Sequence, residues 1–154
     1  MKRMICATVM AVALVSAAAA QGAPLGEGTF AGRLDLRVGI ARLAEIAGTG
    51  DQASLAEYSG ETAVLLFGTL SHPTITNAQP FEAVVEFLEG EWVGTSSILL
   101  HRVYLVFKGD GYREFLDGSS GRRTVVIARD PSIRVSPDGA RDVYLNVISL
   151  RPIF

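Results

Sequence analysis

The stretch SSILLHRVYLVF, residues 96–107, alternates in the way that a β-strand does. One face of this strand would carry His101, Val103, Leu105 and Phe107. The other face would carry Leu100, Arg102, Tyr104 and Val106. Lys108-Gly109-Asp110-Gly111 follows, and its glycines favour a turn because glycine readily adopts positive φ. The pattern predicts a strand that ends in a tight turn.

Three further segments are predicted strands. TAVLLFGTL (62–70) is rich in strand-forming residues and is bounded by Gly60 and Pro73. RRTVVIAR (122–129) follows the turn-rich DGSSG sequence, and VYLNVISL (143–150) follows an Asp-Gly turn. Pro152 would end the last strand, because proline cannot donate to a strand ladder.

Two segments leave the choice between strand and helix open. Residues 81–88 alternate as a strand but also fit helical spacing, with Pro80 and Gly90 suited to the ends of a helix. The valine and phenylalanine content favours the strand. Residues 33–47 fit both periodicities equally. A short helix is predicted over 51–58, with Asp51 as its N-terminal cap.

The segment Ala53…Tyr58-Ser59-Gly60…VLLFGTL resembles the entry to the first strand of tRNA-anti-like OB domains in exported bacterial proteins. The resemblance implies a mainly β fold, a small Greek-key OB-like barrel with one or two short helices. Gly68 would lie where a barrel strand bends sharply. Residues 118–141 depart from that family as a long, turn-rich insertion.

The N-terminus has the three parts of a cleavable signal peptide. Lys2 and Arg3 precede an uncharged apolar run that ends in small residues at Ala20. We expect cleavage before Gln21, a flexible leader over 21–32, and a single domain over 33–154. The product would be periplasmic or secreted, with no transmembrane segment. Cys6 is the only cysteine and lies in the signal, which excludes disulfides and thiolate chemistry from the mature chain.

Charge is unevenly distributed along the chain. Residues 43–100 contain eight acids and no lysine or arginine, whereas nine bases and six acids follow residue 100. Without Lys2 and Arg3, twelve bases oppose sixteen acids, so the net charge is −4. The acids Glu82, Glu86, Glu89 and Glu91 are interpreted as a solvated face. We expect Glu82 and Glu86 to repel a polyanion, which makes nucleic acid an unlikely partner.

Three residues are nominated for binding. Arg102 and Tyr104 share one face of their strand, opposite the face with Val103, Leu105 and Phe107. Trp92 lies between glycines at a predicted connecting turn. An alternative for Trp92 is a buried plug at the end of the barrel, which its usual burial favours. An exposed Trp92 would offer a ring for stacking.

Catalytic, metal-binding and cofactor-binding residues are predicted to be absent. His72 and His101 are not spaced as zinc ligands, and no G-x-S-x-G elbow accompanies them. The prediction is therefore an exported, soluble binding or interaction module without catalysis, for a protein partner or an envelope glycan. The alternative is a small periplasmic hydrolase that uses His72 with a distant serine or aspartate.

Overall fold

The structure is a computed structural model that describes residues 30–153. Its strands are β1 (Arg33–Asp35), β2 (Thr62–Ala78), β3 (Phe81–Val93), β4 (Ser97–Lys108), β5 (Arg123–Val135) and β6 (Arg141–Pro152). Its helices are α1 (Ile40–Thr49), α2 (Gln52–Leu55) and α3 (Arg113–Leu116), with 3-10 turns η1 (Ala56–Tyr58) and η2 (Asp110–Tyr112). The predicted signal peptide (1–20) and residues 21–29 of the predicted leader lie outside the described residues, so export stays a prediction. No helix within 30–153 is both long and apolar enough to cross a membrane.

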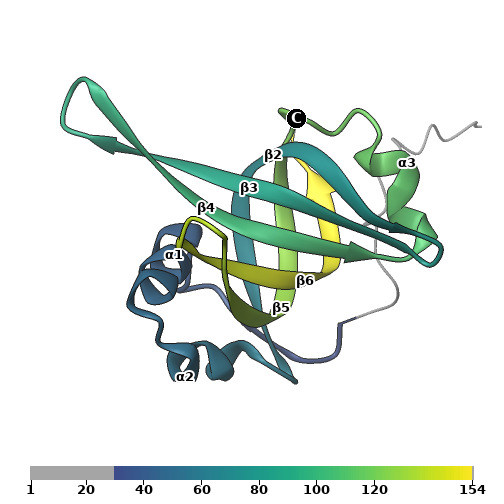
Figure 1. The fold of residues 1–154 in the computed structure, drawn as a ribbon, viewed down its shortest axis with the longest axis horizontal. Helices are drawn as coiled ribbons and strands as arrows, with labels where there is room; N and C mark the ends of the chain where they lie inside the picture. The colour runs from purple at the N-terminus through teal and green to yellow at the C-terminus, as the bar shows by residue number, and fades with distance from the viewer. Residues whose placement is uncertain (1–29, 154) are drawn as a thin grey trace, which may run out of the picture.

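The strands form a barrel in the order β2-β3-β4-β6-β5, which an additional pairing of β2 with β5 closes (Figure 1). The β4–β6 pair is parallel, and the other pairs within the barrel are antiparallel. The short β1 lies parallel to β2 outside this ring. This is the Greek-key order of an OB-fold, in which β2 is the first barrel strand. The predicted fold class is confirmed.

Alternation along β3 and β4 builds the core. Phe81, Ala83, Val85 and Phe87 are buried on β3, and Val103, Leu105 and Phe107 are buried on β4. These β4 residues are on the face that alternation groups together, opposite Arg102 and Tyr104. Helix α1 adds Ile40, Leu43 and Ala47 to the same cluster and packs against β4 and β6. One continuous apolar core therefore lies inside the barrel.

Gly68 lies where β2 passes from one neighbour to the other. Residues 64–69 of β2 pair with β5, and the pairing with β3 begins at Thr69. Figure 1 shows β2 curving strongly around the barrel. A Cβ at position 68 would lie 2.7 Å from the carbonyl oxygen of Leu88, so glycine permits the close approach of the two strands.

The structure resolves the two ambiguous segments. Residues 81–88 belong to β3, as their composition favours. The segment 33–47 divides, because β1 ends at Asp35 and α1 begins at Ile40. The predicted helix over 51–58 is present as α2 and η1, and the Asp51 carboxylate caps it by accepting the Ser54 N–H at 3.1 Å.

Two boundaries were wrong. The strand over 62–70 was predicted to end at Leu70, but His72 and Pro73 also lie within β2, which continues because a shift of register between Leu70 and Pro73 accommodates the proline. The expected insertion over 118–141 is mostly β5. A shift of register near Asp130, whose φ is 53°, bends β5 and lets it continue to Val135.

Candidate functional site

The outer face of β4, β6 and β5 gathers aromatic and positively charged side chains. Residues paired across neighbouring strands point to the same side of a sheet. The register pairs Tyr104 with Tyr144 and Arg134 with Asp142. Arg102 lies two residues before Tyr104 and therefore points to the same side. We call Arg102, Tyr104, Tyr144 and Arg134 the Arg–Tyr patch.

The side chains of the Arg–Tyr patch form a chain of contacts in which the two tyrosine rings stack and each ring has one guanidinium group over it. The Tyr104 and Tyr144 rings are stacked, with centroids 4.8 Å apart and planes inclined by 14°. The Arg134 Cζ lies 4.2 Å from the Tyr144 ring centroid, and the Arg102 Cζ lies 5.9 Å from that of Tyr104. Such contacts orient both rings and both guanidinium groups. The patch is a preorganised surface of alternating cations and π-faces.

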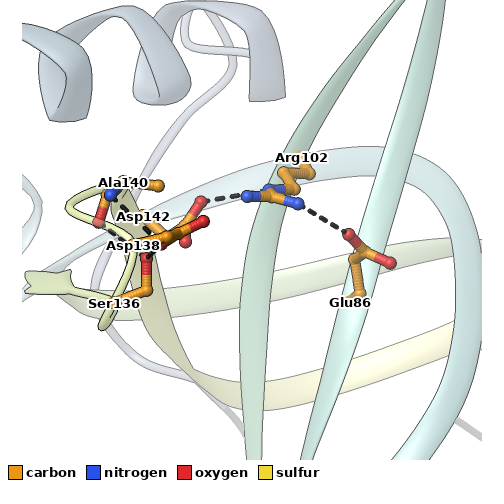
Figure 2. Close-up of polar contacts among 6 residues, drawn as sticks. All are labelled: Glu86, Arg102, Ser136, Asp138, Ala140 and Asp142. Atoms are coloured by element: carbon orange, nitrogen blue, oxygen red, sulfur yellow. Dashed lines mark hydrogen bonds and ion pairs between the residues drawn. The ribbon is translucent and has the colours of Figure 1, made fainter.

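Two carboxylates hold Arg102 (Figure 2). Its Nε donates to Asp142 Oδ1 at 3.1 Å, and its Nη1 lies 3.6 Å from Glu86 Oε1. The hydrogen bond to Asp142 raises the pKa of Arg102 further above its usual value. Partial burial raises the pKa of Tyr104, so its hydroxyl stays protonated at neutral pH and can donate. At neutral pH the patch therefore presents neutral rings and two guanidinium groups, of which that of Arg102 is paired with carboxylates.

The loop between β5 and β6 borders the patch beside Asp142 (Figure 2). Ser136 Oγ donates to Ala140 O at 3.0 Å, and Asp138 accepts from the Ala140 N–H at 3.3 Å. The single proton of the Ser136 hydroxyl is shared between this carbonyl oxygen and Asp138 Oδ1. The bond from Ser136 to Asp138, followed by that from Ala140, lowers the pKa of Asp138. Internal hydrogen bonds thus fix the shape of this loop.

Trp92 is not a buried plug. Its side chain is 68% exposed, which corrects the interpretation that its usual burial favoured. The reason is its position: the pairing of β2 with β3 ends at Leu88, and Trp92 lies beyond that point, opposite Ile98 of β4. In Figure 1 this part of β3 and β4 extends away from the barrel.

The three residues nominated from the sequence share the outer face but do not meet. Register places Trp92 with Ile98, and Ile98 alternates onto the same side as Arg102 and Tyr104. Ile98 and Tyr104 are six positions apart along β4, a span of about 20 Å at the rise of a strand. Arg102 and Tyr104 are neighbours in the patch, whereas Trp92 lies at the far end of the same surface.

Sequence reasoning missed Tyr144 and Arg134. The alternation of residues 143–150 does put Tyr144 opposite the buried Val143, so its outward direction was available. The parallel pairing of β4 with β6 cannot be predicted from a local pattern, because it joins Tyr104 to Tyr144, 40 positions later in the chain. Arg134 was additionally hidden because β5 was expected to end at residue 129.

The acidic cluster is divided and largely paired. Glu82 and Glu86 point outward with the patch, whereas Glu89 and Glu91 alternate onto the opposite side of β3. Glu82 lies 4.0 Å from the Lys108 ammonium, and Glu86 lies beside the guanidinium of the patch. The outer face therefore carries fewer unpaired acids than the sequence indicated.

His72 lines a cleft of about 430 Å³ between β2, β3 and the α3 region. Asp117 and Ser120 line the same cleft, but within residues 30–153 no hydrogen bond or ion pair joins any two of these three side chains. A catalytic nucleophile must contact its base, and the base must be oriented by a third group. The cleft therefore has no assembled hydrolytic site, and the hydrolase alternative has no support.

His101 pairs with Glu91, since its Nε2 lies 3.0 Å from Glu91 Oε2. It is thus partnered at the rim of the barrel rather than packed within it. Across residues 30–153, no group of three or more His, Cys, Asp or Glu side chains is arranged to hold a metal ion.

Comparison with known proteins finds similarity only in structure. No protein-family model matches the sequence, and no curated protein sequence matches it significantly. The small single-stranded DNA-binding protein from Streptomyces coelicolor is 8% identical, with a TM-score of 0.48, over 60% of this chain and 92% of that chain. The Plasmodium falciparum SSB in complex with ssDNA is 14% identical, with a TM-score of 0.44, over 60% of this chain and 94% of that one. At these identities the likeness concerns the barrel alone.

These findings correct the predicted function and partner. The expectation was an envelope protein or glycan as the partner, with nucleic acid unlikely. The two solved structures named above are described as single-stranded DNA-binding proteins, so the expected partner finds no support among them. The charge argument behind it also fails, because Glu82 and Glu86 lie beside bases and Glu89 and Glu91 point to the other side. The resemblance to tRNA-anti-like exported domains finds support only at the level of the OB-fold.

Proposed function

We propose that the protein binds single-stranded nucleic acid across the outer face of β3, β4 and β6, with the Arg–Tyr patch at the centre. The observation that carries the proposal is the Tyr104–Tyr144 stack between two guanidinium groups. OB barrels bind oligonucleotides on the face of their second and third strands, which here are β3 and β4. The fixed loop between β5 and β6 borders this face, as the corresponding loop does in oligonucleotide-binding barrels.

Stacking would dominate the binding energy. An aromatic ring that stacks on a base contributes about 1–3 kcal/mol, and every base offers a π-face. A base would reach a ring of the patch by taking the place of the guanidinium group over it. Arg102 and Arg134 would contact phosphates or bases, although Arg102 must share its guanidinium with Asp142 and Glu86. Binding would therefore be tolerant of sequence and would depend more on rings than on charge.

Because the rings contribute more than the charges, the binding affinity should depend only weakly on salt concentration. For single strands, the slope of log K against log salt is about −0.7 for each phosphate neutralised. Two arginines in the patch then give a slope of about −1.4. A much steeper slope would indicate non-specific attraction to other basic surfaces of the chain.

Trp92 extends the surface and provides a probe. It is the only tryptophan, and its exposed ring lies on the outer face about 20 Å from the patch. An oligonucleotide long enough to span this distance would stack on Trp92 and quench its fluorescence. A short oligonucleotide bound at the patch would leave the fluorescence unchanged.

The test is fluorescence anisotropy with a labelled oligothymidylate at near-physiological salt. Tyr144→Ala should weaken binding about 5- to 150-fold, which is the loss of one stacked ring. Phe67→Ala is the matched control, because Phe67 is an exposed aromatic residue on β2, away from the patch. Absence of binding by the unchanged protein, or equal affinity of the Tyr144→Ala and Phe67→Ala variants, would refute the proposal.

A further inference from the structure

The end of the β3–β4 hairpin is an apolar surface that the barrel does not cover. We call residues 89–101 the distal hairpin. Its large apolar side chains are half exposed or more: Trp92, Val93, Ile98, Leu99 and Leu100. They point to both sides of the hairpin, because side chains alternate along each strand. Contiguous exposed apolar surface of this kind marks an interaction site.

Both long edges of the distal hairpin lack a neighbouring strand within residues 30–153. The pairs of β2 with β3 end at Leu88, and β6 pairs with β4 only from Tyr104 to Val106. Each strand of the distal hairpin thus has the other as its one strand neighbour in the described part of the chain. Unpaired backbone N–H and C=O groups on an open edge are a template for another strand.

The distribution of charge distinguishes the two edges and indicates the occupant. The β3 edge carries Glu89 and Glu91, which disfavour both an anionic partner and self-pairing along that edge. The β4 edge has no charged residue from Ser96 to Leu100. An uncharged, apolar edge is complementary to a second copy of itself and to no phosphate or acidic lipid surface.

We propose that two copies of this chain associate by antiparallel pairing of their β4 edges, with the two-fold axis at Leu99. In this register Leu99 faces the partner's Leu99, and Ile98 faces the partner's Leu100. Aliphatic cross-strand pairs stabilise a sheet, and no like charges are brought opposite each other. The contact is isologous, so it closes at the dimer.

The arrangement has a geometric consequence for the outer face. The two-fold axis of an antiparallel edge contact is perpendicular to the sheet, so the outer faces of both copies lie on the same side. The two Arg–Tyr patches then belong to one continuous surface. The dimer itself rests on the distal hairpin alone and stands independently of the proposed nucleic-acid binding.

Sedimentation of the full chain over a range of concentrations tests the contact. The unchanged protein should show a monomer–dimer equilibrium, and Leu99→Glu should raise the dissociation constant about tenfold or more, because two carboxylates would then face each other. Val93→Glu is the matched control, since it adds the same charge at an equally exposed position on β3 and should leave the dimer intact. Both positions are exposed, so both variants should retain the far-ultraviolet circular dichroism of the unchanged protein.

A mixture tests the register. Leu99→Glu and Leu99→Lys variants should each be monomeric and should form a heterodimer when mixed, because opposite charges would meet at the two-fold axis. Three results overturn the proposal: a monomer at every concentration, dissociation by Val93→Glu as strong as by Leu99→Glu, or a mixture that stays monomeric.

Discussion

The β3–β4 hairpin passes through two environments, and the contrast shows what apolar alternation can and cannot specify. Near the barrel, every second residue of β3 from Phe81 to Phe87 is at most 2% exposed. Beyond Leu88 the same hairpin still carries large apolar side chains, yet Trp92, Ile98 and Leu99 are exposed. The strands are continuous and fully paired with each other in both parts.

The difference lies in what surrounds the hairpin. The proximal part has β2 on one side, β6 on the other and α1 against its inner face. The distal part has none of these strand neighbours. Alternation therefore determines which side chains share a face, whereas burial depends on elements that are distant in sequence.

Truncation of core and hairpin side chains should separate the two parts most strongly. Phe87→Ala removes a fully buried ring and should lower the free energy of unfolding by about 3–5 kcal/mol. Val93→Ala, in the distal part, should change it by no more than about 0.5 kcal/mol. Urea denaturation followed by circular dichroism measures both values. Similar losses in the two variants would mean that the distal hairpin is part of the core.

Substitution of two glycines should also distinguish the barrel from the distal hairpin, by a smaller change in stability. At Gly68, a Cβ would lie 2.7 Å from the Leu88 carbonyl oxygen and 3.0 Å from Phe87 Cζ. Gly68→Ala must therefore displace backbone and should cost about 1–3 kcal/mol.

Gly90 of the distal hairpin is the matched control. A Cβ there would lie 3.2 Å from the Ile98 Cγ2, a side-chain atom that can move into solvent. Gly90→Ala should therefore leave the urea midpoint almost unchanged. A midpoint shift as large as that of Gly68→Ala would contradict the view that the distal strands are free to adjust.

Local signals sufficed for most of the fold. The turn glycines after Phe107, the proline at 152 and the Asp51 cap each act within a few residues, and the elements they predicted are present. The predicted strand ends at Leu70 and Arg129 were wrong because shifts of register let β2 and β5 continue through residues that otherwise end a strand.

The candidate site was only half visible in the sequence. Arg102 and Tyr104 are two residues apart, so their common face follows from alternation. Tyr144 and Arg134 reach them only through the closure of the barrel, which no local pattern encodes. Trp92 was nominated for binding although the average burial of tryptophan favoured the interior, and its exposure depends on where the β2–β3 pairing ends.

The β5–β6 loop and the tip of the β3–β4 hairpin should differ slightly in how their stability depends on pH. The β5–β6 loop is held by hydrogen bonds to Asp138, whereas among the described contacts Thr95 and Ser96 at the hairpin tip make no side-chain hydrogen bond. Because the bond from Ser136 lowers the pKa of Asp138 in the folded protein, the loop's contribution to stability is complete above the ordinary aspartate value of about 3.9. This contribution of the loop to stability is lost as the pH falls through the lowered pKa of Asp138.

A carbon-13 titration of the Asp138 carboxyl should give a midpoint below the ordinary aspartate pKa. Ser136→Ala should move that midpoint upward, since it removes the largest cause of the shift. An unchanged midpoint in Ser136→Ala would show that the hydroxyl does not hold the loop, and the β5–β6 loop would then be no better supported than the hairpin tip.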